Sequence, residues 1–465
     1  MTEDLKRYAA LSRIKGHWLT GSLLPFVHRP LEFYAECARL HADIALGRLG
    51  PIPICVLSNP CHVEQVLIGD AASYQQTRLL RALLKSLLGE GLLIAGNESH
   101  ARQRSLVEKA VHSGITAAWV EEVVDATERF ARSWTRGEPR DLYPEMLRVV
   151  SEVLTGVVFG AGQHAKDVST AVDHAIDLAT NRIQHFPPIP EFVPTRANLE
   201  VRQALREMDR AVFGAIRERH VFPEAKSRLL STLGAARGEG GTQLSDIEIH
   251  DQIVMIYLAV RHNMAAALTW TFYLLSQSDE IYAKVLRDVE SVGATGQPGM
   301  AEAERLVYCD RVVKESLRLY PPVWQVLRHA ERDTRIGDHK IRAGTQVLMS
   351  QWVLHRDARL FEEPEKFMPD RWEYPREEWK FSYFPFGAGP RACLGQRLTF
   401  LTVKLVLAVL TRRCRLNLVP GQDVKVLPAF ALRPCDPLVM ETRTWAGDLG
   451  REVDESGRPH PKLVP

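Results

Sequence analysis

The chain has 465 residues, a length that allows one large domain or up to about three ordinary ones. Hydrophobic residues make up 45% of it and charged residues 25%, as is ordinary for a soluble globular protein, and its formal net charge is +2. The net charge argues neither for nor against a nucleic-acid partner, but the chain has no basic low-complexity tail, and we expect no such partner. The seven cysteines lack the spacing of a disulfide framework, which favours a cytoplasmic location over a secreted scaffold.

The two ends of the chain are polar. Charged residues interrupt Met1 to Pro25, so this stretch predicts neither a signal peptide nor a membrane anchor. Gly447 to Pro465 is polar and predicts a loosely packed tail. We therefore expect a single domain over residues 1–465, with an N-terminal extension of about 1–25 and a C-terminal tail of about 447–465.

A small β-containing region is predicted near the N-terminus. Residues 30–40 have the pattern of an amphipathic helix followed by a turn, and residues 52–57 form a short β-rich run. Asn59-Pro60 then leads into a short helix over residues 62–67. Residues 72–95 are expected to be loop-like and carry Arg78, Arg81 and Lys85 between leucines; the alternative is that these basic residues lie on the solvated face of a helix.

Helical patterns dominate the middle of the chain. His100 and Arg104 are four residues apart, so on a helix they share one face and could hold acidic groups of a ligand. Residues 115–186 show helical periodicity, whereas the proline-rich residues 186–194 cannot be the interior of a helix. A glycine-rich connector follows at 234–242.

A long helix is predicted to begin at Ser245, because Ser245 and Glu248 form a capping box. It should run for roughly thirty residues, to about Ser276. Residues 253–275 are mostly apolar and long enough to span a membrane, but 261–263 are Arg-His-Asn, which is costly in lipid. We expect instead a helix buried in a large protein and polar where it passes a site.

Two further features precede and follow the C-terminal glycine-rich loop. Glu315 and Arg318 share one helix face and can form an ion pair. Residues 415–446 have the pattern of short strands that close the small β region.

The glycine-rich loop itself spans residues 384–399 and contains one cysteine, Cys393. An apolar run follows it and predicts a buried helix, whose N-terminus would help Cys393 lose its proton. The neighbouring glycines, Gly387, Gly389 and Gly395, would let the backbone approach a flat macrocycle closely. No second cysteine or His-x-x-His lies nearby to complete a zinc site, so a thiolate-bound haem iron is the better interpretation.

The pattern Phe386-x-x-Gly389-x-Arg391-x-Cys393-x-Gly395 resembles the haem-binding loop of the cytochrome P450 family, with every signature position filled. The resemblance extends over roughly residues 20–445. It implies a mainly α fold with a small β-rich part, in which haem b lies between the long central helix and the helix after the cysteine loop. Cys393 would be the iron ligand.

The resemblance also implies roles for other positions. The haem propionates and the haem-binding loop would be held by the residues His100, Arg104, Arg328, Arg391, Phe386, Gly389 and Gly395. Glu315, Arg318 and Arg371 would form a structural network that fixes the loop carrying Cys393.

Three segments would surround the substrate, and a separate set of residues would bind the electron donor. Residues 186–194 would be a mobile lid, and residues 72–95 would cover the substrate. Residues 323–327, with Trp324 and Gln325, would line the pocket. On the cysteine side, the guessed docking residues for the donor are Arg102, Arg397 and Lys404.

The oxygen-binding helix departs from the family pattern. Alignment places Ala259 to Asn263 on the oxygen-activation motif, where Val260, His262 and Asn263 replace the usual glycine, acid and threonine. Either His262 and Asn263 replace the proton relay, or the substrate supplies its own hydroxyl or amine, or the enzyme uses peroxide or radical coupling. Alternatively, Arg261 would grip a substrate carboxylate, which makes all three central residues candidates for catalysis.

The implied function is a haem-thiolate monooxygenase that oxidises a small organic substrate in bacterial secondary metabolism. It would use O2 and two electrons from a separate ferredoxin and ferredoxin reductase, and we expect a monomer. One alternative is a peroxide-using or radical-coupling enzyme without ordinary oxygen insertion. A second alternative is a non-catalytic haem sensor or electron carrier, against which the lid and pocket segments argue.

Overall fold

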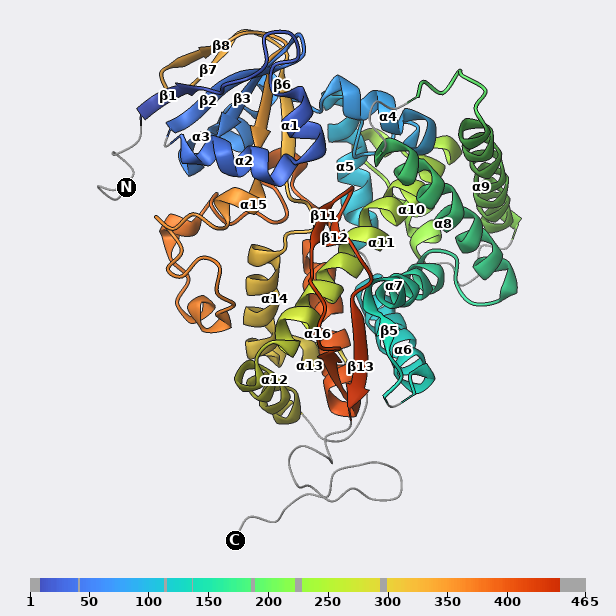
Figure 1. Ribbon diagram of the computed structural model, residues 1–465. Helices are drawn as coiled ribbons and strands as arrows, with labels where there is room; N and C mark the ends of the chain where they lie inside the picture. Colours follow the sequence, from blue (N-terminus) through green and yellow to red (C-terminus); the bar gives the residue numbers. More distant parts are fainter. Residues whose placement is uncertain are drawn as a thin grey trace.

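A computed structural model describes residues 9–40, 42–112, 115–135, 137–184, 189–221, 228–292 and 299–443 (Figure 1). Helices build most of this part of the chain, and a sheet lies at one end of the molecule (Figure 1). The predicted mainly α fold with a small β-rich part is confirmed. The predicted tail at 447–465 lies outside the described residues.

The largest sheet has six strands in the order β1-β2-β3-β9-β6-β4. Its strands are β1 (Ala9–Arg13), β2 (Ala42–Leu49), β3 (Ile52–Leu57), β4 (Tyr74–Gln75), β6 (Val326–Ala330) and β9 (Gln346–Met349). β1 pairs in parallel with β2, so the described part of the expected N-terminal extension belongs to this sheet. The sequence predicted a turn where β2 lies, and that prediction was wrong; β2 pairs along its length with β3.

Short strands complete the β structure. β10 (Arg415–Leu418), β13 (Val439–Arg443) and β5 (Arg140–Asp141) form one sheet, and β11 (Val426–Pro428) pairs with β12 (Leu432–Pro434). β7 (Thr334–Ile336) pairs with β8 (His339–Ile341). The predicted strands near the C-terminus are therefore confirmed as far as residue 443.

The helices cover the rest of the described chain. Those before the central helix are α1 (Leu23–His28), α2 (Pro30–Arg39), α3 (Pro60–Glu64), α4 (Arg78–Leu88), α5 (Asn97–His112), α6 (Ile115–Ser133), α7 (Leu142–Val158), α8 (Gln163–Gln184), α9 (Arg196–Val221) and α10 (Arg228–Ala235). The central helix and those after it are α11 (Asp246–Ser276), α12 (Asp279–Ser291), α13 (Met300–Arg305), α14 (Val307–Leu319), α15 (Gln351–Leu354) and α16 (Gln396–Arg413). A short π-helical segment at Gln65–Gly69 continues α3, so the short helix predicted over residues 62–67 is confirmed.

The middle of residues 72–95 forms α4 and not a loop, which confirms the alternative of a solvated helix face for its basic residues. The Thr77 side chain caps the helix by accepting a hydrogen bond from the Leu80 N–H at 3.3 Å. Leu84, Leu87 and Leu88 are buried on one face, while the basic residues lie outside it. The leucines follow helical spacing, so amphipathic packing accounts for the difference.

α11 is the central helix of the molecule. The predicted capping box is confirmed: Ser245 N–H donates to Glu248 Oε2 at 2.9 Å, and Glu248 N–H donates to Ser245 Oγ at 3.2 Å. The helix is long and apolar enough to cross a membrane by length and composition, but 72% of its most apolar window is buried inside the protein. It packs on α7, α14 and α16, as expected of a buried core helix.

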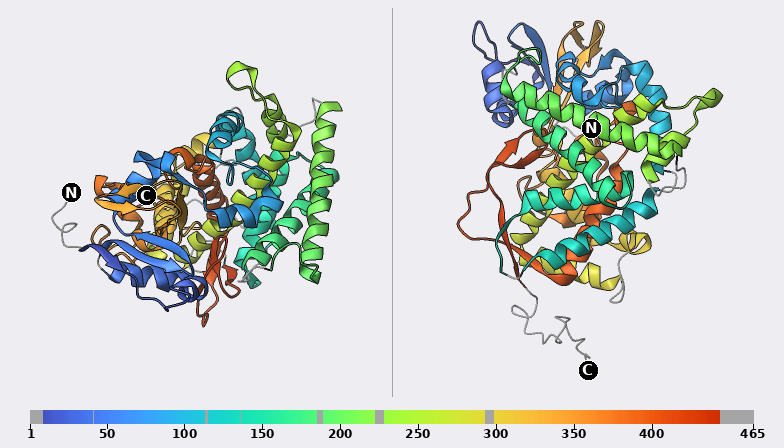
Figure 2. Two further views of the ribbon diagram at one scale, coloured as in Figure 1. Left: turned by 90° about the horizontal axis from the view of Figure 1, so that it is seen from above. Right: turned by 90° about the vertical axis from the view of Figure 1, so that its right-hand side faces the viewer.

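α8 and α9 pack against each other and form an outer layer beyond α7 and α11 (Figure 2). The proline-rich segment that was predicted to break the helices lies between them. Residues 185–188 are outside the described part, and residues 189–194 form no helix, as expected.

Candidate active site

The loop that carries Cys393 folds back on itself just before α16. The Cys393 N–H donates to the Phe386 carbonyl at 2.9 Å, and the Gly395 N–H donates to Cys393 Sγ at 3.3 Å. Gln396 begins α16, whose segment from Leu401 to Thr411 is fully buried, so the predicted helix after the cysteine is confirmed. The thiol therefore lies at a helix N-terminus, where free N–H groups favour a thiolate.

The protein alone stabilises the thiolate form of Cys393 only in part. Although the Cys393 side chain is accessible to solvent, the protein packed around its sulfur raises the pKa of the thiol, and the Gly395 N–H and the charge of Arg104 only partly oppose that shift. A metal ion bound to sulfur deprotonates a coordinating thiol outright. An iron at this position would thus supply the stabilisation that the protein provides only in part.

The glycines of the loop serve different purposes. Gly389 has a φ of +71°, and a Cβ there would lie 1.8 Å from the Leu67 carbonyl oxygen. The missing side chain of Gly389 is thus explained by a contact with the π-helical segment after α3, not by the approach of a macrocycle. A Cβ on Gly395 would lie 3.7 Å from Cys393 Sγ, so this glycine leaves the sulfur open. That the backbones of Gly389 and Gly395 contact a cofactor stays a prediction.

The predicted network beneath the loop is confirmed. Arg318 donates from Nε and Nη2 to the two carboxylate oxygens of Glu315, each at 2.9 Å. Arg371 Nε donates to Glu315 Oε1 at 3.0 Å, and the Trp372 indole donates to Oε2 at 2.9 Å. Glu315 and Arg318 are completely buried, so each charge depends on the other.

His355 connects this network to the cysteine loop. Its Nε2 accepts a hydrogen bond from the Phe384 N–H at 3.0 Å, and its Nδ1 donates to the Arg318 carbonyl at 3.3 Å. Burial and the charges of Arg318 and Arg356 lower the pKa of His355 to about 3. The ring is therefore neutral, and its role is structural.

Basic side chains converge beside the cysteine loop. Arg104 Nη1 donates to the Ala392 carbonyl at 2.8 Å, and Arg391 Nη2 donates to the Ala95 carbonyl at 2.8 Å. His100 and Arg328 are buried, with exposures of 6% and 9%. Among the described residues, none of the three arginines forms an ion pair with a carboxylate.

This cluster of His100, Arg104, Arg328 and Arg391 lacks compensating charge. Burial and the charges of Arg391, Arg104 and Arg328 lower the pKa of His100 to about 4. Burial and Arg391 lower the pKa of Arg328 to about 10. An anionic ligand would relieve both effects, so the donor set fits the two carboxylates of a haem.

On α11, Asn263 offers an acceptor that the protein leaves free. Its Nδ2 donates to the Ala259 carbonyl, one helical turn earlier, at 2.8 Å. Its Oδ1 is buried and has no hydrogen-bond partner among the described residues. A buried orphan acceptor is costly, so this oxygen is placed to accept from a water or a ligand.

Arg261 and His262 point instead toward α7 and α8. Arg261 Nη2 donates to Asp177 Oδ2 at 3.2 Å, and its Nε lies 3.1 Å from Asp173 Oδ1. His262 Nε2 lies 3.4 Å from Asp177 Oδ1, while its Nδ1 lies 3.1 Å from the Tyr143 hydroxyl. For Arg261 to grip a substrate carboxylate, both of its ion pairs would have to break.

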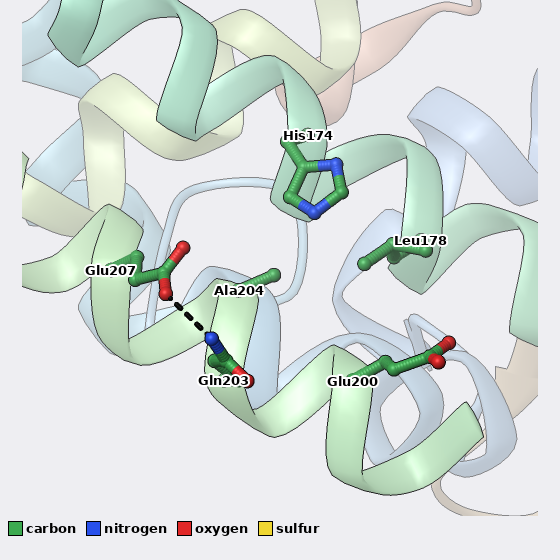
Figure 3. A pocket seen from close by; sticks show the side chains of 6 residues that line it. All are labelled: His174, Leu178, Glu200, Gln203, Ala204 and Glu207. Atoms are coloured by element: carbon green, nitrogen blue, oxygen red, sulfur yellow. Dashed lines mark hydrogen bonds between the residues drawn. The ribbon is translucent and has the colours of Figure 1, made fainter. Parts of the chain in front are cut away.

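His262 borders a cavity of about 160 Å³ between α7, α8, α11 and the turn that joins β11 to β12. Its lining comprises Tyr143, Leu147, Asp177, Thr180, Asn181, His262, Ala429, Phe430, Ala431 and Arg433. Another hollow, of about 200 Å³, lies between the outer helices α8 and α9, and polar, acidic and apolar side chains line it: His174, Leu178, Glu200, Gln203, Ala204 and Glu207 (Figure 3). There Gln203 donates to Glu207 at 2.9 Å, and none of the predicted site residues takes part.

The sequence interpretation missed Asp173, Asp177 and Tyr143. Asp177 is 84 residues from Arg261, and Tyr143 is 119 residues from His262, so no local spacing links them. The structure also bears on the expectations for Lys404 and Trp324. Lys404, guessed to face an electron donor, is buried near Asp310, which corrects that guess. Trp324 is buried and donates to the Ala429 carbonyl at 3.0 Å.

Comparison with known proteins decides the family. The family model for cytochrome P450 matches residues 12–438. The chain belongs to the cytochrome P450 family. It is 32% identical over 423 residues to cyclooctatin synthase of Streptomyces melanosporofaciens, covering 89% of this chain and 91% of that one.

Two further bacterial relatives are named for oxygenation. Cyclooctat-9-en-7-ol 5-monooxygenase of the same organism is 31% identical, with coverage of 87% of this chain and 88% of the relative. Pentalenene oxygenase of Streptomyces avermitilis is 28% identical, with coverage of 88% and 91%. These similarities make the chain a P450 monooxygenase whose cofactor contains haem iron.

The fold agrees with that of a solved P450. Retinoic acid-bound cyanobacterial CYP120A1 matches with a TM-score of 0.80 at 22% identity, covering 94% of this chain and 99% of that one. At this identity the match supports the fold alone. The predicted P450 fold is therefore confirmed.

Proposed function

We propose that this P450 uses haem b and O2 to oxygenate a cyclic, largely hydrocarbon terpenoid in bacterial secondary metabolism. Its two electrons would come from a separate ferredoxin and ferredoxin reductase, and the enzyme would act as a cytoplasmic monomer. The observation that carries the proposal is the group of uncompensated basic side chains, His100, Arg104, Arg328 and Arg391, beside the Cys393 thiol. The names of the bacterial relatives support the substrate class.

The described residues fit haem b, which is held without covalent bonds through its two propionates. Cys393 Sγ would ligate the iron, and the four basic side chains would hold the propionates. Phe386 would support the loop, since its carbonyl accepts from Cys393 and its ring lies 5.7 Å from that of Phe400. When bound, thiolate-ligated haem supplies the activation of dioxygen and favours O–O cleavage.

An apolar substrate agrees with the charges around α11. Arg261, the cationic side chain in the middle of that helix, is already paired with Asp173 and Asp177. Ala259 and Val260 precede it, and both are only partly buried. A hydrocarbon skeleton would gain by covering such surface, by about 25 cal/mol for each Å² removed from water.

His262 and Asn263 are our candidates for the proton relay. Asn263 Oδ1 would hold a water by accepting a hydrogen bond from it, and the imidazole of His262 would pass protons on. Two alternatives remain as outcomes of the test: a substrate hydroxyl that completes the relay, and peroxide as the oxidant. The relative named for an alkenol makes the first alternative chemically reasonable.

The test is turnover of purified enzyme with two probes, pentalenene and cyclooctat-9-en-7-ol. Each probe is incubated with ferredoxin, ferredoxin reductase and NADPH under oxygen-18 gas, with peroxide alone, or with neither. The proposal expects a product that carries one labelled oxygen atom in the first arm only. Turnover with peroxide alone would support the peroxygenase alternative. Absence of product and of any substrate-induced spectral change with both probes would contradict the terpenoid class.

A further inference from the structure

The charges around the oxygen-activation motif are distributed between two helices. In the family pattern the motif carries an acid on the central helix, but α11 carries Arg261 and His262 at this point. The acids come from α8, where Asp173 and Asp177 lie one helical turn apart. The carboxylates therefore face the motif from a neighbouring helix.

Asp177 is the carboxylate that contacts His262. The distance from Asp177 Oδ1 to His262 Nε2 is 3.4 Å, and the same carboxylate also binds Arg261. The side chain of Asp177 is 43% exposed, whereas that of His262 is only 13% exposed. Asp177 thus lies between solvent and a nearly buried imidazole.

Tyr143 fixes the other side of the His262 ring. With the proton of the neutral ring on Nε2, toward Asp177, Nδ1 accepts from the Tyr143 hydroxyl at 3.1 Å. Tyr143, Asp177 and His262 all line the cavity of about 160 Å³ described above, which is large enough for several waters. A path for protons therefore has a donor, an acceptor and space for water.

We propose that Asp177 is a proton-relay residue that acts through His262, so that α8 supplies the acid that α11 lacks. This inference rests on the proposed function. The Tyr143 hydroxyl passes its proton to His262 Nδ1 and takes another from a water in the cavity, which gives an imidazolium that Asp177 stabilises. Return of a proton from Nδ1 through the same hydroxyl to a cavity water restores the neutral ring. Asp177 stays ionised throughout, and no electrons are transferred in these steps.

Electrostatics agree with an ionised Asp177. Burial raises the pKa of the Asp177 carboxyl, but hydrogen bonds and charge from His262 and Arg261 outweigh burial and give a net decrease. For Asp173, burial dominates and raises the pKa despite Arg261. The other charged or titratable groups that face this cluster are Tyr143 on α7 and Arg433 in β12.

A purely structural role for Asp177 makes a different prediction. In that case the carboxylate would only hold α8 against α11 through Arg261, as Asp173 also does. Asp173→Asn is therefore the matched control, because among the contacts described it removes a partner of Arg261 and leaves the Asp177–His262 contact intact. Asp177→Glu keeps the charge and serves as the rescue variant.

The experiment measures product formed per NADPH, its solvent deuterium isotope effect and its pH profile, in the wild type and the variants Asp177→Asn, Asp177→Glu and Asp173→Asn. We expect Asp177→Asn to lower product per NADPH by about tenfold or more and to raise the isotope effect. Its spectral affinity for substrate should not change. Asp177→Glu should recover most of the coupling, and Asp173→Asn should retain it.

A double substitution distinguishes a proton relay from a purely structural role of Asp177. If both residues act in one relay, Asp177→Asn adds little to the loss already caused by His262→Ala. Equal losses in Asp177→Asn and Asp173→Asn, with no change in isotope effect, would overturn the relay. Failure of the wild type itself to turn over with the reductase system would count against the proposed function instead, so the two failures are distinguishable.

Discussion

The Nε2 atom of His355 accepts a hydrogen bond from the backbone N–H of Phe384 at 3.0 Å. This contact attaches the first residue of the cysteine loop to the same histidine whose Nδ1 binds the carbonyl of Arg318. The position of Cys393 thus depends on a buried chain that starts at the Glu315–Arg318 pair.

Replacing His355 with leucine should destabilise the protein without changing its charge at neutral pH. The substitution leaves the Phe384 N–H and the Arg318 carbonyl buried without partners, which costs about 2 kcal/mol. A urea titration followed by circular dichroism measures the free energy of unfolding. His164→Asn, at a side chain that is 60% exposed, is the control and should change it by less than about 0.5 kcal/mol. An equal, small change in both variants would contradict the proposed attachment.

Glu315→Gln should be more severe, because it leaves Arg318 as a buried charge without its counter-ion. Breaking one member of a buried ion pair costs about 3–5 kcal/mol, whereas an exposed pair is worth under about 1 kcal/mol. Glu363→Gln, which breaks the exposed pair with Lys366, is the matched control. Soluble yield and thermal midpoint should fall in the first variant only. Retention of both in Glu315→Gln would show that the network is dispensable.

The basic cluster beside Cys393 should determine how tightly haem is retained. Removing one charged hydrogen bond to a propionate costs about 1.5–3 kcal/mol, so Arg328→Leu should speed haem loss roughly ten- to a hundredfold. Transfer of haem to apomyoglobin measures that rate. Arg332→Leu, at a side chain that is 66% exposed and lies 3.7 Å from Asp70, is the control. Identical transfer rates in both variants would remove Arg328 from the propionate site.

His250 should make stability depend on alkaline pH. It lies between Asp209 and Asp251, each at 3.1 Å; burial lowers its pKa, but these carboxylates outweigh burial and raise it to about 9. Because the folded pKa exceeds the unfolded one, this contribution is fully present below about pH 6.5 and is lost as pH rises through 9. The contacts join α9 to α11, and the Glu90 N–H after α4 donates to the same Asp251 at 2.7 Å.

Free energies of unfolding at pH 6.5 and 9.5 test this prediction. The wild type should lose up to about 3 kcal/mol between these values, and His250→Asn should lose clearly less. His164→Asn should behave like the wild type, since His164 pairs with Glu218 at an exposed position. The same loss in His250→Asn as in the wild type would show that other groups cause the pH dependence.

Local patterns in the sequence predicted much of the fold. Ser245 and Glu248 are three residues apart, so their capping box located the start of α11 before any tertiary contact was known. The Cys393 loop was equally local, because all its signature positions lie within ten residues. Such features depend on neighbours in the chain and can be seen in one sequence.

The missed elements depend on partners far away in the chain. β2 has only a weak strand pattern, and its pairing with β1 and β3 decides its structure. Asp177 belongs to an ordinary helical stretch, and only the packing of α8 on α11 brings it to His262. Lys404 was guessed as a surface residue from its charge alone, although α16 buries it near Asp310.

The central claim is that the thiolate of Cys393 ligates a haem iron. The most direct test is the ferrous–CO absorption spectrum of the purified wild type, of Cys393→Ala and of Cys435→Ala, an exposed free cysteine that serves as the matched control. We predict that the wild type and Cys435→Ala show the red-shifted band of thiolate-ligated haem and that Cys393→Ala lacks it. A red-shifted band in Cys393→Ala would contradict the account.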